Sequence, residues 1–197
     1  MTDWLLALVP TYGLWLLAVT TFLSCLALPL PASILMLTAG GFVAAGDLVL
    51  WQVGAAAYAG AIAGDVTGFH LGRFGGAGLL ERLGREPSRK KLIGMATAIM
   101  EKRGTVGIFL TRWLFSAIGP WANFAGGAIG YDRRRFVLAA AAGEMVWVGL
   151  YVGLGNAFAG NLEAANDMMG SILGVLAAGA VMVGLGLWLR SLLRQQT

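Results

Sequence analysis

The chain has 197 residues, of which 58% are hydrophobic and 12% are charged, and its mean hydropathy is +0.75. Soluble domains carry about 25% charged residues, so this composition excludes an ordinary soluble domain and predicts an all-α polytopic membrane protein. The net charge is +4, and the places of the basic residues along the chain are more informative than their sum.

Six apolar stretches approach the roughly 20 residues that a membrane-crossing helix needs. They cover 5–24, 27–46, 50–72, 105–130, 136–158 and 168–189. The chain start has no basic region ahead of its apolar residues, so we expect no cleavable signal sequence. Cys25 is the single cysteine, and its apolar surroundings predict a filler without a functional role. His70 is the single histidine, and there is no CxxC or HExxH pattern, so we expect no metal site and no cofactor.

The segment 76–103 joins the third stretch to the fourth and mixes basic residues with Leu, Ile and Met at helical spacing. This pattern predicts an amphipathic cytoplasmic segment, broken at Pro87, that lies on the lipid headgroups and attracts anionic lipids. A soluble linker is the alternative.

The basic residues also indicate how many stretches cross the membrane, because cytoplasmic loops carry the excess of Lys and Arg. Eight of the 14 lie in 73–103, three in 133–135 and two near the C-terminus. Six full crossings would leave either eight or five of them outside. If 27–46 and 105–130 are re-entrant hairpins, four crossings remain, thirteen basic residues are cytoplasmic and so are both termini.

Helix breakers inside both stretches favour this topology. The first contains Pro29 and Pro31, and the second contains Gly119 and Pro120, which we expect to form the hairpin turn. Proline removes a backbone donor, and in a membrane a broken backbone must be buried in protein or face a watery cavity. Two proline-kinked spans are the alternative.

The two halves of the chain resemble each other. Residues 39–42 read AGGF and residues 125–128 read AGGA, and 54–72 can be aligned with 137–155. This alignment pairs Gly60 with Gly143 and Gly72 with Gly155. Because the aligned segments would run in opposite directions through the membrane, we predict an inverted repeat of two units, each a re-entrant hairpin followed by a transmembrane helix. Flanking transmembrane helices complete the expected fold.

Three ionisable residues, Asp65, Arg112 and Glu144, lie inside apolar stretches. At 1.5 Å per residue, each is about 10–12 Å from the cytoplasmic end of its helix, so they fall near one level. The cluster either pins the hairpin or lines a polar substrate and proton pathway, in which one carboxylate without a counter-charge could hold a proton. Asn123 follows the second break and could bond the broken backbone or a substrate headgroup.

These motifs resemble the DedA family, also called the VTT or SNARE-associated Golgi protein family, over roughly residues 20–160. The most specific piece is GDVTGFHLGR, Gly64–Arg73, followed by FLTRWLF, Phe109–Phe115, and a downstream AGG. The resemblance implies a lipid-transporting protein of the bacterial inner membrane, often dependent on the proton-motive force. It also implies that Asp65 is the acid of the family's G-D motif and Arg112 the first arginine of its R-[FW]-x-P-x-x-R motif.

The chain departs from the family pattern at three positions. Ser33 stands where an acid usually follows the prolines, Ile118 replaces the second arginine, and Phe115 replaces the motif proline. The lost acid and the lost arginine have opposite charges, so the charge of the expected cavity barely changes. If the acid and the second arginine bind substrate and proton in other members of the family, this chain is expected to transport a different lipid or to lack proton coupling.

We therefore expect an integral membrane flippase or scramblase that moves phospholipid or undecaprenyl phosphate between leaflets, with proton coupling left open. A proton-coupled exporter of small ions or solutes and a non-transporting membrane-integrity scaffold are the alternatives. The expected partners are membrane lipids and protons and not nucleic acid, and a homo-oligomer is left open. An enzyme is not expected, because the sequence contains no recognisable Ser-His-Asp set or P-loop lysine.

Overall fold

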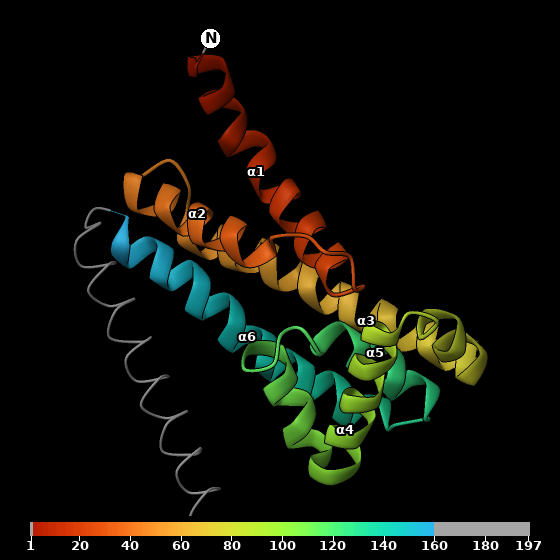
Figure 1. The fold of residues 1–197 in the computed structure, drawn as a ribbon. Helices are drawn as coiled ribbons and strands as arrows, with labels where there is room; N and C mark the ends of the chain where they lie inside the picture. Colours follow the sequence, from red (N-terminus) through yellow and green to blue (C-terminus); the bar gives the residue numbers. More distant parts are fainter. Residues whose placement is uncertain (1, 160–197) are drawn as a thin grey trace, which may run out of the picture. The chain divides into compact units, whose positions relative to one another are not determined.

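A computed structural model describes residues 2–159, and this part of the chain is helical without strands (Figure 1). The helices are α1 (Thr2–Ser24), α2 (Ala32–Ala45), α3 (Leu50–Leu83), α4 (Pro87–Trp113), α5 (Gly119–Ala128) and α6 (Arg133–Phe158). The expected all-α class is thereby confirmed for these residues. The predicted 168–189 stretch lies outside the described residues.

The first break in the chain separates α1 from α2. Residues 25–31 are non-helical, and Pro31 is the N-cap residue of α2. We expected both arms of a hairpin within 27–46, but the structure forms one helix there, so the two arms around the break are α1 and α2. The prolines explain the difference, because they lack the N–H that a helix interior needs and fit only ahead of a helix or in its first turn.

The second break separates α4 from α5 and covers residues 114–118. We expected Gly119 and Pro120 to form this turn, but they are the first residues of α5. The first helical N–H groups have no intrahelical acceptor, so proline costs α5 nothing at that position. In both halves a proline therefore marks the start of the second arm rather than the turn itself.

Two glycines divide the long helices α3 and α4. Gly76 has φ +53° and Gly104 has φ +52°, a left-handed region that a residue with a Cβ rarely adopts. The predicted amphipathic segment 76–103 starts at the first kink and ends just before the second. Pro87 begins α4, so the segment is also interrupted where the sequence predicted.

The glycines of α3 and α6 make matched contacts with the helices around them. A Cβ at Gly60 would collide with the Thr21 hydroxyl of α1, and a Cβ at Gly143 would collide with the Arg112 side chain of α4. The sequence alignment pairs these two glycines. The backbones of α3 and α6 therefore approach α1 and α4 at equivalent positions.

The second aligned pair extends this correspondence. A Cβ at Gly72 would collide with the carbonyl of Phe124 in α5, and a Cβ at Gly155 would collide with the carbonyl of Leu37 in α2. Thus α3 packs on α1 and α5, whereas α6 packs on α4 and α2. If α1, α2 and α3 correspond to α4, α5 and α6, the contact of α3 with α1 corresponds to that of α6 with α4. The contact of α3 with α5 then corresponds to that of α6 with α2.

The direction of α1 differs from the sequence expectation. Gly60 of α3 lies against Ala18 of α1, and Gly68 lies against Leu26, which follows α1. The helices α1 and α3 therefore run in the same direction. In the topology predicted from the sequence, 5–24 crosses the membrane in the direction opposite to that of α3. The close approach of small residues along one face of α3 accommodates a parallel neighbour instead, and the starts of α1 and α3 lie on the same side.

Large apolar side chains cover the outside of the helices. Trp15 is 73% exposed, Trp51 is 70% and Phe74 is 85%. In a membrane these groups would contact acyl chains or the interface, where tryptophan is enriched. Among the described residues, α6 alone is long and apolar enough to cross a membrane by length and composition.

Candidate functional site

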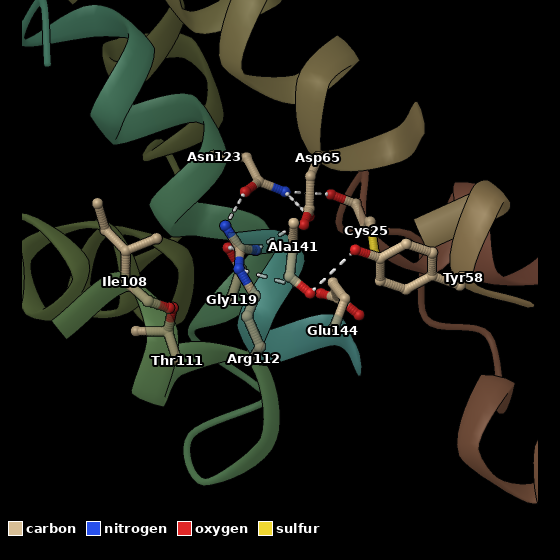
Figure 2. A network of polar contacts seen from close by, with 10 residues as sticks. All are labelled: Cys25, Tyr58, Asp65, Ile108, Thr111, Arg112, Gly119, Asn123, Ala141 and Glu144. Carbon is tan, nitrogen blue, oxygen red and sulfur yellow. Dashed lines mark hydrogen bonds and ion pairs between the residues drawn. The ribbon is translucent and has the colours of Figure 1, made fainter. Parts of the chain in front are cut away.

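A polar network at the second break is centred on Arg112 (Figure 2). This side chain is in the last turn of α4 and is 4% exposed. Its Nη1 donates to Oδ1 of Asp65 over 3.0 Å and to the carbonyl of Gly119 over 3.3 Å. The guanidinium also lies 5.4 Å from the centre of the Phe136 ring. A buried charge needs such partners, because an uncompensated one would cost several kcal/mol.

Asn123 connects the network to the first break. Its carboxamide oxygen accepts from Nη2 of Arg112 over 2.7 Å. Its Nδ2 donates to Oδ1 of Asp65 over 2.8 Å and to the carbonyl of Cys25 over 2.9 Å. Both donors of the amide and its oxygen are therefore engaged within the protein. Of the two roles considered for Asn123, satisfying the broken backbone is the one that these contacts support.

Glu144 brings α6 to the same site. Its Oε1 lies 4.0 Å from Nε of Arg112, and the residue is 2% exposed. Oε2 of Glu144 and Oδ2 of Asp65 have no hydrogen-bond partner among the described residues. The structure thus brings together the three ionisable residues that the sequence placed at one level, and two carboxylates face a single guanidinium.

A cavity of about 370 Å³ borders this network. The residues that line it come from both breaks and from α6, and they include Ser33, Pro31, Arg112, Pro120 and Glu144. Gly119 also lines it, whereas Asp65, Asn123 and Pro29 are not among the lining residues. Charged and hydroxyl groups thus face open space beside the broken backbone, which is where a membrane protein tolerates it.

Comparison with known proteins identifies the family. A family model described as the VTT domain matches residues 30–157. The chain belongs to the VTT-domain, or DedA, family of membrane proteins. The resemblance predicted from GDVTGFHLGR and FLTRWLF is confirmed.

The relatives of this VTT-domain protein include uncharacterized membrane proteins of Synechocystis sp. and of mycobacteria. The Synechocystis protein is 30% identical over 130 residues, which are 64% of this chain and 58% of that protein. The Mycobacterium bovis protein is 29% identical over 129 residues, which are 63% of this chain and 59% of that protein. The matched region is therefore less than two thirds of each relative's length. No solved structure matches the chain.

A second cavity of this VTT-domain protein lies between the end of the apolar part of α3 and the start of α6. It measures about 530 Å³, and its lining includes His70, Arg73, Phe74, Tyr131 and Arg133. Nη1 of Arg73 donates to the Tyr131 carbonyl over 3.3 Å. Two arginines and an exposed aromatic ring therefore share one opening.

Sequence reasoning missed two residues of the first site. Cys25 has its thiol sulfur within 4.8 Å of carboxylate oxygens of Asp65 and Glu144. Trp147 lines the cavity, and its buried indole nitrogen has no hydrogen-bond partner among the described residues. A lone cysteine in an apolar run carries no local signal of this proximity, because the contact depends on how α1 packs on α3. For Trp147 the signal was available, since it follows Glu144 by three residues and shares its helix face.

Proposed function

We propose that this VTT-domain protein is a lipid flippase or scramblase that moves phospholipid or a polyprenyl phosphate, such as undecaprenyl phosphate, between leaflets of the bacterial inner membrane. The observation that carries the proposal is the cavity of about 370 Å³ beside the buried guanidinium of Arg112. The guanidinium can bind an anion once the carboxylates of Asp65 and Glu144 are protonated or displaced from it, and the phosphate of a lipid headgroup is the anion that a membrane supplies.

The lengths of α2 and α5 support re-entrant hairpins. At 1.5 Å per residue, the 14 residues of α2 span about 21 Å and the 10 residues of α5 about 15 Å. Neither reaches the roughly 30 Å of the hydrocarbon core alone. In the proposed topology α1 and α2 enter from one side, α4 after Gly104 and α5 enter from the other, and their tips meet at the cavity.

The matched glycine contacts support an inverted repeat. In α3, Gly60 meets α1, the first arm of one hairpin, and Gly72 meets α5, the second arm of the other. In α6, Gly143 meets the first arm α4 and Gly155 the second arm α2 in the same way. With α3 and α6 crossing in opposite directions, the axis relating the halves would lie in the membrane plane. Many transporters place their substrate site where two such repeats meet.

The basic residues support an orientation with 73–103 and 133–135 in the cytoplasm. Since α1 runs parallel to α3, its start would then lie on the outer side. This replaces the cytoplasmic N-terminus expected from the sequence. The second cavity, with Arg73 and Arg133, would open at the cytoplasmic headgroups and receive an anionic lipid before it moves toward Arg112.

Proton coupling follows from the charges of the first site. Asp65 and Glu144 together carry one negative charge more than Arg112 balances. A proton on either carboxylate would neutralise the excess, and an arriving phosphate would compete with the carboxylates for the guanidinium. We propose that the lipid headgroup and the proton bind to this site in alternation. We also propose that the protein transports its substrate without breaking covalent bonds in it.

The test is a leaflet-resolved transport assay in proteoliposomes with labelled phospholipid or labelled polyprenyl phosphate. Ser33→Trp fills the cavity without touching the hydrogen bonds of Arg112, and we expect at least a tenfold loss of transport. Met145→Trp is the matched control, because Met145 is 63% exposed, is not among the residues that line the cavity, and the ring can extend into lipid. Each variant is first shown to elute and to melt like the wild type in detergent.

The outcomes separate the candidate functions. Lipid transport that Ser33→Trp removes and Met145→Trp preserves supports the proposal, and dependence on an imposed proton gradient supports coupling. Transport of a small anion in the same vesicles, with no movement of lipid, would replace lipid by a solute as substrate. A correctly folded protein that moves neither would overturn the transporter and leave a scaffold.

A further inference from the structure

Three soft or anionic groups from separate segments converge beside Arg112. They are the Cys25 thiol from the first break, the Asp65 carboxylate from α3 and the Glu144 carboxylate from α6 (Figure 2). One ligand atom from each lies within 4.8 Å of the other two. All three residues are buried, with exposed fractions of 6%, 1% and 2%.

The carboxylates retain unused ligating capacity. Arg112 bonds Oδ1 of Asp65 and lies nearest Oε1 of Glu144, whereas Oδ2 and Oε2 have no partner among the described residues. A buried acceptor without a partner costs about 1–3 kcal/mol, more when it is charged. A cation bound between these oxygens would remove that cost.

From this convergence we propose a site for a single thiophilic divalent cation, of the class of Zn²⁺ or Cd²⁺, bound by Cys25, Asp65 and Glu144. Thiolate with two carboxylates is a zinc-type ligand set, and sulfur disfavours Mg²⁺ and Ca²⁺. When the metal–sulfur bond forms, the thiol proton is released to solvent. Two carboxylates and a thiolate against the Arg112 guanidinium then sum to −2, which a divalent cation neutralises.

The dimensions of the site are compatible with this ion after a small contraction. Zinc binds sulfur at about 2.3 Å and carboxylate oxygen at about 2.0–2.2 Å, so its ligand atoms stand about 3.5 Å apart. Separations of up to 4.8 Å therefore close by about 1.3 Å at most. Cys25 and Glu144 line the cavity of about 370 Å³, which provides a route for the ion and room for a water as fourth ligand.

The experiment measures metal directly and needs no transport activity, so it is independent of the proposed function. Full-length protein in detergent is titrated with Cd²⁺, and the cadmium–thiolate charge-transfer absorption and the metal content after gel filtration are recorded. We expect one Cd²⁺ per chain, a charge-transfer band, and competition by Zn²⁺ but not by Mg²⁺. Cys25→Ser should remove the band and weaken binding at least tenfold, and Glu144→Gln should weaken binding while the band persists.

His70→Ala is the control, because His70 is the single histidine of the chain and lies outside this cluster. It should leave stoichiometry, band and affinity unchanged. Elution volume and circular dichroism establish that each variant is folded, with Cys25→Ala as a second thiol-free variant. Wild-type protein that binds no Cd²⁺, or a band and affinity that survive in folded Cys25→Ser and Cys25→Ala, would overturn the site.

Discussion

The helix pairs α1–α2 and α4–α5 share one packing scheme but differ in chemistry. Thr21 of α1 meets Gly60 of α3, and Arg112 of α4 meets Gly143 of α6, so the two side chains occupy equivalent places. The Thr21 hydroxyl donates to the Leu17 carbonyl of its own helix over 2.9 Å, whereas Arg112 reaches across to α3 and α5. A near-symmetric scaffold built on glycine contacts thus carries an asymmetric polar site, and the charge belongs to the second hairpin.

The largest expected effect comes from these equivalent positions. Arg112→Ala leaves two buried carboxylates without a counter-charge and should lower the free energy of unfolding by about 3–5 kcal/mol. Thr21→Ala removes a hydroxyl that donates only within its own helix, to the carbonyls of Leu17 and Ala18, and should cost about 0.5–1.5 kcal/mol. Denaturant unfolding in detergent micelles measures both. Equal losses at the two positions would contradict the asymmetry.

Asn123→Leu tests the link between the two breaks. The substitution preserves volume but removes the bonds to Arg112, Asp65 and the Cys25 carbonyl. Leaving these buried groups unpaired should cost about 1–3 kcal/mol. Limited proteolysis around 25–31 should also become faster, because the first break loses its tie to α5. Unchanged stability together with unchanged proteolysis would show that the link is dispensable.

The matched glycines provide a test of the symmetry itself. Gly72→Ala and Gly155→Ala each place a methyl group against a carbonyl of the opposite hairpin, that of Phe124 and that of Leu37. We expect each to lower the free energy of unfolding by about 1–3 kcal/mol, by similar amounts. If one variant unfolds like the wild type, the two halves do not pack alike.

The smallest effect is expected at two glycines of α6 whose outer face meets no other helix in the part of the chain that the structure describes. An added Cβ at Gly149 or Gly153 meets no atom of residues 2–159 within 4 Å. Alanine there should stabilise the helix by about 0.5–1 kcal/mol, because glycine loses more backbone freedom on folding. A loss of stability in the same denaturant assay would indicate a neighbour at that face, such as another part of the chain or a second copy.

Much of this arrangement was predictable from local sequence. The alignment of 54–72 with 137–155 pairs glycines that make equivalent contacts, and the distances of Asp65, Arg112 and Glu144 from their helix ends predict that the three lie at one level. Helical periodicity and rise are regular, so positions along an apolar helix translate directly into depth. Proline and glycine likewise indicated where helices are interrupted: Pro29 and Pro31 lie in the first break, whereas the second break ends just ahead of Gly119 and Pro120.

The sequence by itself determined a helical membrane protein of the VTT-domain family. It also determined which glycines contact other helices and that Asp65, Arg112 and Glu144 lie at one depth, because composition, spacing and motifs are local properties of the chain. Only the tertiary structure decided that α1 runs parallel to α3, that the Asn123 side chain bonds the Cys25 carbonyl, and that the Cys25 thiol lies beside the carboxylates of Asp65 and Glu144. Those contacts join residues 40 to about 120 positions apart. No local preference encodes them, since they arise when whole helix faces pack against one another.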